Sequence, residues 1–271
     1  MKRLITTPMN TETFMASHDT SATWQETYLV RSYEADIQGN ATMPLLCRLM
    51  QESASNHAEH LGLGITWLTE NNLAWVLRRQ RITMDAYPRW GETVQILTWP
   101  TGKDRLLWHR DFRLLNEKDD VIGRATTSWL VIDRASRRPQ RADTLPPLDP
   151  PGDVERAFPR WAERVATLSE DAPSYFVGVR YRDLDVNAHV NSAQYIEWTL
   201  EAFDLGFHRT HHLKEIEVNY LLEALYKDRL SAHCERAGQE QKGQQTYLHS
   251  LVRDADGFEL FRARTEWTHI E

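Results

Sequence analysis

The chain of 271 residues is long enough for two small domains, and 41% hydrophobic residues with ten tryptophans supply ample material for buried cores. Its 32 basic and 39 acidic residues give a formal charge of -7, which provides no overall attraction to nucleic acid or to an anionic membrane surface. Two cysteines are too few for a disulfide framework, and no stretch approaches the ~20 apolar residues of a membrane span, so we expect a cytoplasmic protein without membrane insertion.

The first half of the chain predicts one long helix followed by four strands. A flexible lead-in of about twenty residues precedes them, because it lacks a continuous apolar run. Residues 42–62 place apolar side chains at three-to-four spacing, which predicts an amphipathic helix of about five turns that ends at Gly62. The strands, rich in aromatic and β-branched residues, are expected at 73–87, 92–101, 105–115 and 121–133.

A proline-rich segment divides the chain. Seven of the eleven prolines fall between Pro139 and Pro173, and the stretch "LPPLDPPGD" at 145–153 is incompatible with a regular helix or strand. We therefore expect a linker at 143–172, between an N-terminal domain at 22–142 and a C-terminal domain at 173–271.

The second half repeats the element order of the first. A helix is predicted at 192–206, with strands at 214–225, 228–237, 244–254 and 259–270. Arg124 with Arg262, and Trp129 with Trp267, share an offset of 138, and "RSYEADIQGN" matches "RYRDLDVNAH". This order indicates a duplication. The predicted class is α+β, with each half wrapping an antiparallel sheet around a helix and the two sheets joined.

A polar turn stands just ahead of the second predicted helix. Asp185, Asn187 and His189 alternate along the chain, so their side chains can converge on one side. Asn191 occupies an N-cap position, and the helix end behind it can stabilise a developing oxyanion. Turns and caps also favour Asp and Asn for purely structural reasons. The first copy has no histidine here, so we expect no second active site.

The polar turn belongs to the longer segment "DLDVNAHVNSAQYIEWTLEA", which is followed by "VNYLLEAL". These motifs resemble the catalytic segment of the fatty acyl-ACP thioesterases, the plant enzymes and their bacterial relatives. The segments "YPRWGETVQILTW", "WHRDFRLL" and "GRATTSWLVIDRASRRPQR" resemble the N-terminal half of that family, so the resemblance covers about residues 26–267. It implies a tandem (double) hotdog that hydrolyses the thioester of fatty acyl-[acyl carrier protein] and needs no cofactor or metal.

The resemblance also assigns the catalytic set Asp185, Asn187, His189 and Glu223, the last on a strand. Two mechanisms stay open. In one, Glu223 and His189 hold and deprotonate a water while Asp185 orients them; in the other, Asp185 attacks through a mixed anhydride. Many plant members carry a cysteine after the glutamate, but Ala224 stands here, which argues against a cysteine nucleophile.

Four further expectations concern the surroundings of this set. Asp183 is expected to be a solvated turn residue paired with Arg180 or Arg182, and Cys234 a buried structural thiol. The acyl-chain pocket is expected in the N-terminal half, between the long helix and the strand at 73–87. The basic residues of the segment "RASRRPQR", at 134–141, are expected to form a docking face for the acidic acyl carrier protein, or alternatively a solvated loop. These are Arg134, Arg137, Arg138 and Arg141.

The same residues are compatible with two other functions, but not with a calcium or zinc site. An acyl-CoA thioesterase is the nearest alternative, and a non-catalytic acyl-binding sensor on a hotdog scaffold is one from another class. A homodimer of this chain is a further option. A calcium loop is excluded because Ala188 and Gln194 stand where such a loop needs Gly and Glu, and "HAEH" and "HRTHH" lack zinc-ligand spacing.

Overall fold

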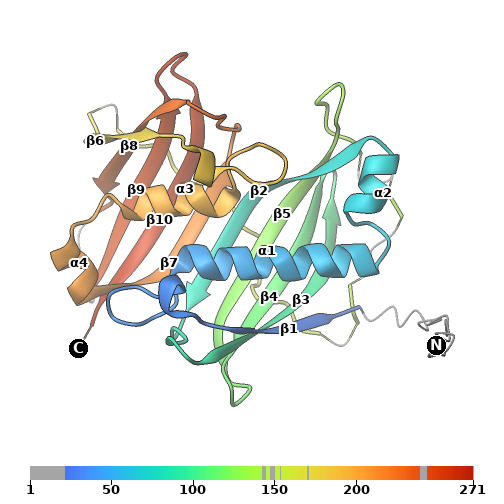
Figure 1. The fold of residues 1–271 in the computed structure, drawn as a ribbon, viewed down its shortest axis with the longest axis horizontal. Helices are drawn as coiled ribbons and strands as arrows, with labels where there is room; N and C mark the ends of the chain where they lie inside the picture. Colours follow the sequence, from blue (N-terminus) through green and yellow to red (C-terminus); the bar gives the residue numbers. More distant parts are fainter. Residues whose placement is uncertain are drawn as a thin grey trace, which may run out of the picture.

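One continuous antiparallel sheet of ten strands runs through the molecule (Figure 1). The computed structural model describes residues 22–141, 145–146, 150–152, 154–169, 171–238 and 243–270. The predicted flexible lead-in and part of the predicted linker lie outside these residues. In spatial order the strands are β1-β3-β4-β5-β2-β7-β10-β9-β8-β6, so each half of the chain contributes five neighbouring strands.

The N-terminal half wraps five strands around one long helix (Figure 1). Its strands are β1 (Trp24–Leu29), β2 (Leu73–Met84), β3 (Thr93–Asp104), β4 (Leu107–Leu115) and β5 (Val121–Asp133). Its helices are η1 (Ser32–Glu34), α1 (Met43–His60) and α2 (Ile65–Glu70). The Thr42 side chain caps α1 by accepting from the Leu45 backbone N–H at 3.3 Å. Gly62, at φ +73°, follows its end, which confirms the predicted helix.

The C-terminal half repeats this arrangement with a shorter helix. Its strands are β6 (Ser174–Gly178), β7 (His211–Tyr220), β8 (Arg229–Arg236), β9 (Gln244–Arg253) and β10 (Glu259–His269). Its helices are η3 (Tyr181–Asp183), α3 (Ser192–Leu200) and α4 (Leu205–Thr210). The halves join where β2 pairs with β7, with Ile82 opposite Ile216. The predicted tandem hotdog is therefore confirmed.

Three differences from the predicted elements bear on function. The helix expected at 192–206 stops at Leu200, because Asp204 caps a second helix by accepting from the Phe207 N–H at 2.7 Å. Strand β7 ends at Tyr220, so Glu223 lies in the loop that follows and not on a strand. Strands β1 and β6 and helix α2 were not predicted, because they are short and carry weak apolar periodicity.

The described part of the predicted linker forms no helix or strand and straps the sheet on the face opposite α1. Successive residues of β4 point to opposite faces. Arg110 lines a cavity beside α1, whereas the buried carboxylate of Asp111 accepts from the Ala157 N–H at 2.8 Å. Farther along, the Val165 N–H donates to the Asn219 side chain on β7 at 2.9 Å. The strap thus bridges strands from both halves.

The larger of the two clusters of buried apolar side chains in the described residues extends through both halves, from Met50 and Leu46 on α1 to Ile196 on α3. Both helices therefore share one core, which fixes the halves relative to each other. In the described residues, no helix is long and apolar enough to cross a bilayer.

Candidate active site

The polar turn folds around one carboxylate. Asp185 Oδ1 accepts from the backbone N–H of Asn187 at 2.8 Å and from that of His189 at 3.3 Å. Ala188 adopts φ +60°, and Leu184 pairs with Val190 across the turn. The side chain of Asp185 is therefore engaged in shaping the turn, and it is not among the groups that line the nearby cavity.

The first copy contains the same turn with different side chains. Asp36 Oδ1 accepts from the N–H groups of Gln38 at 2.8 Å and Asn40 at 3.0 Å, and Gly39 adopts φ +83°. The aspartate and the left-handed residue thus belong to the duplicated fold. Only the second copy places a histidine there, as the sequence analysis expected.

Replacing Gly39 by alanine is expected to lower the free energy of unfolding by about 1 kcal/mol, because an L-residue is strained at this φ. The new methyl group meets nothing closer than Arg89 Nη2 at 3.8 Å, so the effect isolates the backbone. Denaturant unfolding measures the change. Gly152→Ala is the control, since that glycine has no positive φ and open space around it. Equal effects of the two substitutions would contradict the assignment.

Asp183 supports the turn from within the protein, which corrects one expectation. It is 3% exposed and not solvated. Its carboxylate accepts from the Arg180 N–H at 2.6 Å and lies 3.7 Å from Arg182 Nε, so the expected pairing with arginine is present. Glu34 makes the equivalent bond to Arg31 in the first copy, at 2.9 Å. Asp183 is therefore a structural part of the repeat.

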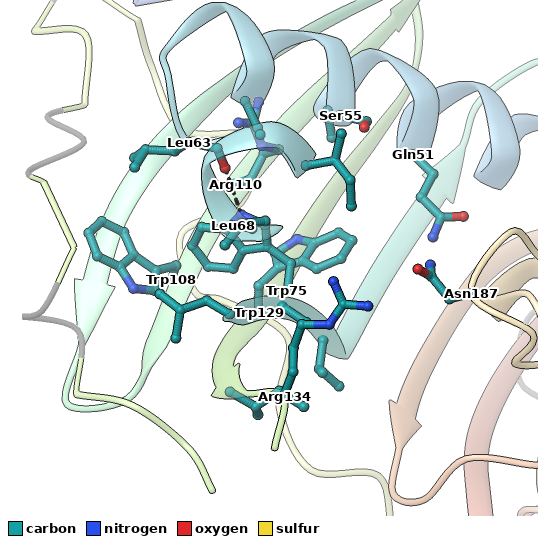
Figure 2. A pocket seen from close by; sticks show the side chains of 18 of the residues that line it. Gln51, Ser55, Leu63, Leu68, Trp75, Trp108, Arg110, Trp129, Arg134 and Asn187 are labelled. Carbon is teal, nitrogen blue, oxygen red and sulfur yellow. Dashed lines mark hydrogen bonds between the residues drawn. The ribbon is translucent and has the colours of Figure 1, made fainter. Parts of the chain in front are cut away.

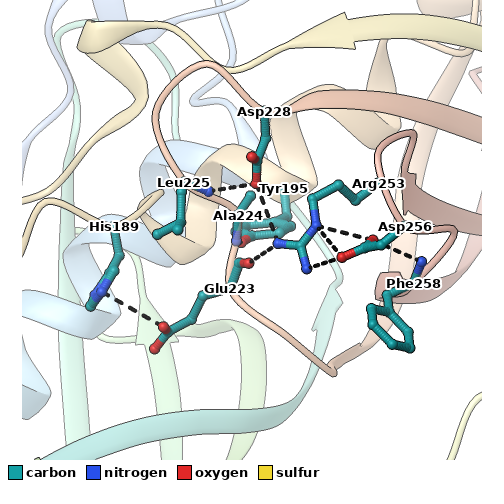
Figure 3. Close-up of polar contacts among 9 residues, drawn as sticks. All are labelled: His189, Tyr195, Glu223, Ala224, Leu225, Asp228, Arg253, Asp256 and Phe258. Atoms are coloured by element: carbon teal, nitrogen blue, oxygen red, sulfur yellow. Dashed lines mark hydrogen bonds and ion pairs between the residues drawn. The ribbon is translucent and has the colours of Figure 1, made fainter.

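His189 and Glu223 meet at the junction of two loops. His189 Nε2 lies 3.6 Å from Glu223 Oε2, and about a third of each side chain is exposed (Figure 3). The Ala224 N–H donates to Tyr195 Oη at 2.7 Å, which fixes the backbone next to Glu223. Burial raises the pKa of Tyr195 above its ordinary value, so this hydroxyl stays neutral.

Arg253 of β9 anchors the same loop from the other side. Its guanidinium donates to the Glu223 carbonyl at 3.4 Å and forms ion pairs with Asp228 at 3.4 Å and Asp256 at 2.8 Å (Figure 3). The pairing with Asp256 raises the pKa of Arg253, so the anchor stays charged. Tyr195 and Arg253 were not predicted as supports, although Tyr195 lies in the segment "DLDVNAHVNSAQYIEWTLEA" that carries the resemblance.

The basic residues expected to dock the carrier protein divide into two pairs. Arg134 and Arg137 line the cavity beside His189 and Glu223, and Arg137 Nη2 donates to Glu223 Oε2. All four arginines are exposed, but Arg138 and Arg141 are not among the lining residues. The four arginines therefore do not share one environment.

A cavity of about 460 Å³ opens beside these groups and extends into the N-terminal half. Figure 2 shows its two ends: Asn187 faces Gln51 of α1 at one side, and Trp108 lies at the other. The body is mainly apolar. It is lined by Ala54, Ala58, Leu63, Leu68, Leu73, Trp75, Val76, Trp108, Trp129 and Ile132. Trp75 lines the cavity where the pocket was expected, whereas Met50 and Met84 are core residues.

The corresponding space in the C-terminal half is filled with aromatic rings. Phe203, in the break between α3 and α4, lies 4.4 Å from Phe207, 4.8 Å from Tyr247 and 4.8 Å from Trp267, measured between ring centroids. Trp267 is the repeat partner of the cavity residue Trp129. The break in the helix thus closes in one half the space that the continuous α1 leaves open in the other.

A buried cation forms part of the cavity wall. Arg110 is 8% exposed, and its Nη1 lies 3.0 Å from His57 Nδ1 and 3.2 Å from Thr98 Oγ1. Burial lowers the pKa of Arg110 to about 10, so it remains charged at neutral pH. Arg110 was not among the predicted site residues; the signal was an arginine inside the largely aromatic and apolar segment "RLLWHRDFRLL".

The end of α3 does not form the expected oxyanion site. The N–H of Asn191 donates to the Asp183 carbonyl, that of Ala193 to the Asn191 side chain, and that of Gln194 to the Asn191 carbonyl. Asn191 is thus confirmed as the N-cap. Its capping and the turn itself consume these donors, so little of the helix end remains free for a ligand.

The environments of the two cysteines disfavour a nucleophilic role. Burial raises the pKa of Cys234 to about 12, which disfavours the nucleophilic thiolate, and does the same for Cys47. Cys234 is half-buried rather than fully buried as expected. Among the described residues, no group of three or more His, Cys, Asp or Glu side chains could hold a metal ion.

A tandem hotdog whose halves share one sheet, with a histidine and a glutamate at the mouth of an apolar cavity, defines the class as a hotdog thioester hydrolase. Comparisons with known proteins identify the family. The models for the acyl-ACP thioesterase N-terminal and C-terminal domains match residues 21–144 and 169–269. The chain therefore belongs to the acyl-ACP thioesterase family.

Individual relatives are similar to this chain in sequence or structure over most of their length. The chloroplastic oleoyl-acyl carrier protein thioesterase 2 of Arabidopsis thaliana is 30% identical, over 90% of this chain and 76% of its own. The crystal structure of an acyl-ACP thioesterase from Bacteroides thetaiotaomicron superposes with a TM-score of 0.79 at 25% identity, covering 91% of this chain and 98% of the other. The 12:0-ACP thioesterase from Umbellularia californica gives 0.80 at 25% identity, with 93% and 95% covered.

Proposed function

We propose that this chain hydrolyses the thioester of fatty acyl-[acyl carrier protein], with Asp185, Asn187, His189 and Glu223 as its site. The observation that carries the proposal is the His189–Glu223 pair, 3.6 Å apart, at the polar end of an apolar cavity of about 460 Å³. An acyl chain suits the apolar body, and the thioester then lies beside the polar pair.

The chemistry requires a base for the attacking water and a donor for the oxygen that becomes negative. Glu223 and His189 hold and deprotonate the water, and the Asn187 side chain donates to the carbonyl oxygen. Asp185 acts by positioning, because its Oδ1 already binds the two backbone amides that place Asn187 and His189. The water route is therefore favoured over a mixed anhydride.

Asp185→Asn separates these routes. The asparagine side chain keeps an oxygen that can accept from the amides of Asn187 and His189, but it is no nucleophile. On the water route, kcat is expected to fall by about tenfold or less. A fall by the ~10³-fold or more that accompanies loss of a nucleophile would favour the anhydride. Asp36→Asn in the first copy is the control, since it makes the same change in the turn without the histidine.

The proposed function is tested by free-thiol release from a panel of acyl-ACPs and the matching acyl-CoAs, with His189→Ala as control. Turnover on acyl-ACP that disappears in the variant is the expected result, and the panel gives the chain-length preference. Faster turnover on acyl-CoA would point to an acyl-CoA thioesterase. Binding of acyl ligands without hydrolysis of either carrier would point to a sensor.

The proposal also covers the roles of the two domains, the docking of the carrier protein, and the location and assembly of the chain. The N-terminal hotdog, 22–142, supplies the acyl pocket, the linker is 143–172, and the C-terminal hotdog, 173–271, supplies the catalytic residues. The exposed Arg138 and Arg141, with Arg134 at the cavity edge, dock the acidic carrier protein by charge complementarity. A cytoplasmic location and assembly as a homodimer stay predictions.

A further inference from the structure

Arg137 reaches from the N-terminal half to a catalytic residue of the C-terminal half. Its Nη2 donates to Glu223 Oε2, the same oxygen that lies 3.6 Å from His189 Nε2. The two paired side chains are 53% and 33% exposed, so each has the freedom to leave if the contact is lost. The guanidinium thus holds the Glu223 carboxylate at the distance at which it meets His189.

The loop that carries Arg137 is built tightly. Asp133 Oδ1 accepts from the Ser136 N–H at 2.7 Å, and the Asp133 carbonyl accepts from the Arg137 N–H at 2.9 Å. Asn72 binds the second oxygen of Asp133 at 3.0 Å, and Ile132 pairs with Pro139 behind the turn. Hydrogen bonds to Ser136 lower the pKa of Asp133, which keeps this acceptor charged. The backbone that carries the Arg137 side chain is therefore held in place by these hydrogen bonds.

The backbone at Arg137 is better suited to glycine. Its φ is +59°, a left-handed conformation that costs an L-residue roughly 1 kcal/mol. Arginine at this position therefore makes the protein less stable than glycine would, unless its side chain forms a compensating contact. The only carboxylate that the described structure pairs with this guanidinium is that of Glu223.

We propose that Arg137 is a positioning residue for the reaction: it orients the Glu223 carboxylate toward His189 and the attacking water, and it completes the site from the other half. The inference rests on the proposed thioesterase function. It differs from carrier-protein docking, because a positioning residue acts on every thioester substrate, whereas a docking residue acts only on those carried by the protein. Misplacing a reacting group by about 1 Å can lower a rate 10²-fold.

The test compares Arg137→Gly, Arg137→Lys and Glu223→Gln with the wild-type chain, on acyl-ACP and on the acyl-pantetheine of the same chain length. For Arg137→Gly we expect kcat to fall about 10- to 100-fold on both substrates, with little change in KM. Its stability is expected to hold or rise, because glycine suits φ +59°. Guanidinium ion added to Arg137→Gly, and lysine in the Arg137→Lys variant, are expected to restore part of kcat.

Two further measurements make the test decisive. In the Glu223→Gln background, Arg137→Gly should add little further loss, since both substitutions disable the same group. Arg105→Gly is the matched control: this exposed arginine also has a positive φ, +28°, but lies on the hairpin between β3 and β4, away from the cavity lining. It should leave turnover of acyl-pantetheine unchanged.

Each contrary result has its own meaning. An unchanged kcat in Arg137→Gly, with Glu223→Gln inactive, would overturn the positioning role while leaving the thioesterase function intact. A raised KM for acyl-ACP alone would assign Arg137 to docking and also overturn it. A wild-type chain that hydrolyses neither substrate would instead remove the proposed function.

Discussion

Replacing Glu223 by glutamine is expected to lower kcat on acyl-ACP by about 10²- to 10⁴-fold, the range that general bases contribute. Glutamine keeps the size of the side chain and an oxygen for Arg137, but it cannot take a proton from water. Because the loop is held through backbone contacts to Tyr195 and Arg253, the folded structure should be retained. Single-turnover kinetics, with unfolding curves for each variant, measure the two effects.

The same kinetic measurements test whether His189 and Glu223 act together. His189→Gln should reduce kcat to a similar extent, and the double variant should lose little more, because the pair acts as one unit. Glu52→Gln, at an exposed position of α1 outside the cavity lining, is the matched control and should leave kcat unchanged. If Glu223→Gln kept more than a tenth of wild-type kcat, Glu223 would not be the base.

Filling the cavity at Ala58 is expected to shift the chain-length preference toward short acyl chains. Gln51, Ala54 and Ala58 lie on one face of α1, and Ala58 lies about 10 Å farther along the helix axis than Gln51, which faces Asn187 at the mouth (Figure 2). In the Ala58→Trp variant, the indole ring occupies the space that the distal part of a long acyl chain would take. For long-chain acyl-ACP, kcat/KM should fall about 10- to 200-fold.

Short chains that end before Ala58 should be hydrolysed as by the wild type, so the ratio of the two rates is the measurement. Glu52→Trp adds the same ring to the same helix outside the cavity lining and serves as the control. A uniform loss for all chain lengths would mean that the substitution disturbs the fold. An unchanged preference would mean that the acyl chain lies elsewhere.

The sequence by itself determined most of the elements and indicated candidate residues for the chemistry. Apolar spacing located α1 and eight strands, because periodicity is a local property that each segment carries alone. The repeat offset and the two matching turns indicated the duplication. The same turns indicated Asp185, Asn187 and His189 as candidate site residues, and showed that the first copy, with Gln38 and Asn40, lacks the histidine.

The tertiary structure decided which of these groups meet. Arg137 and Glu223 are 86 positions apart and approach only because β2 pairs with β7 and joins the halves. Whether a helix leaves a cavity open, as α1 does, or closes it, as Phe203 does in the break after α3, depends on packing against the other strands. Such contacts have no periodic signature in the chain, since they depend on how distant segments pack together in space.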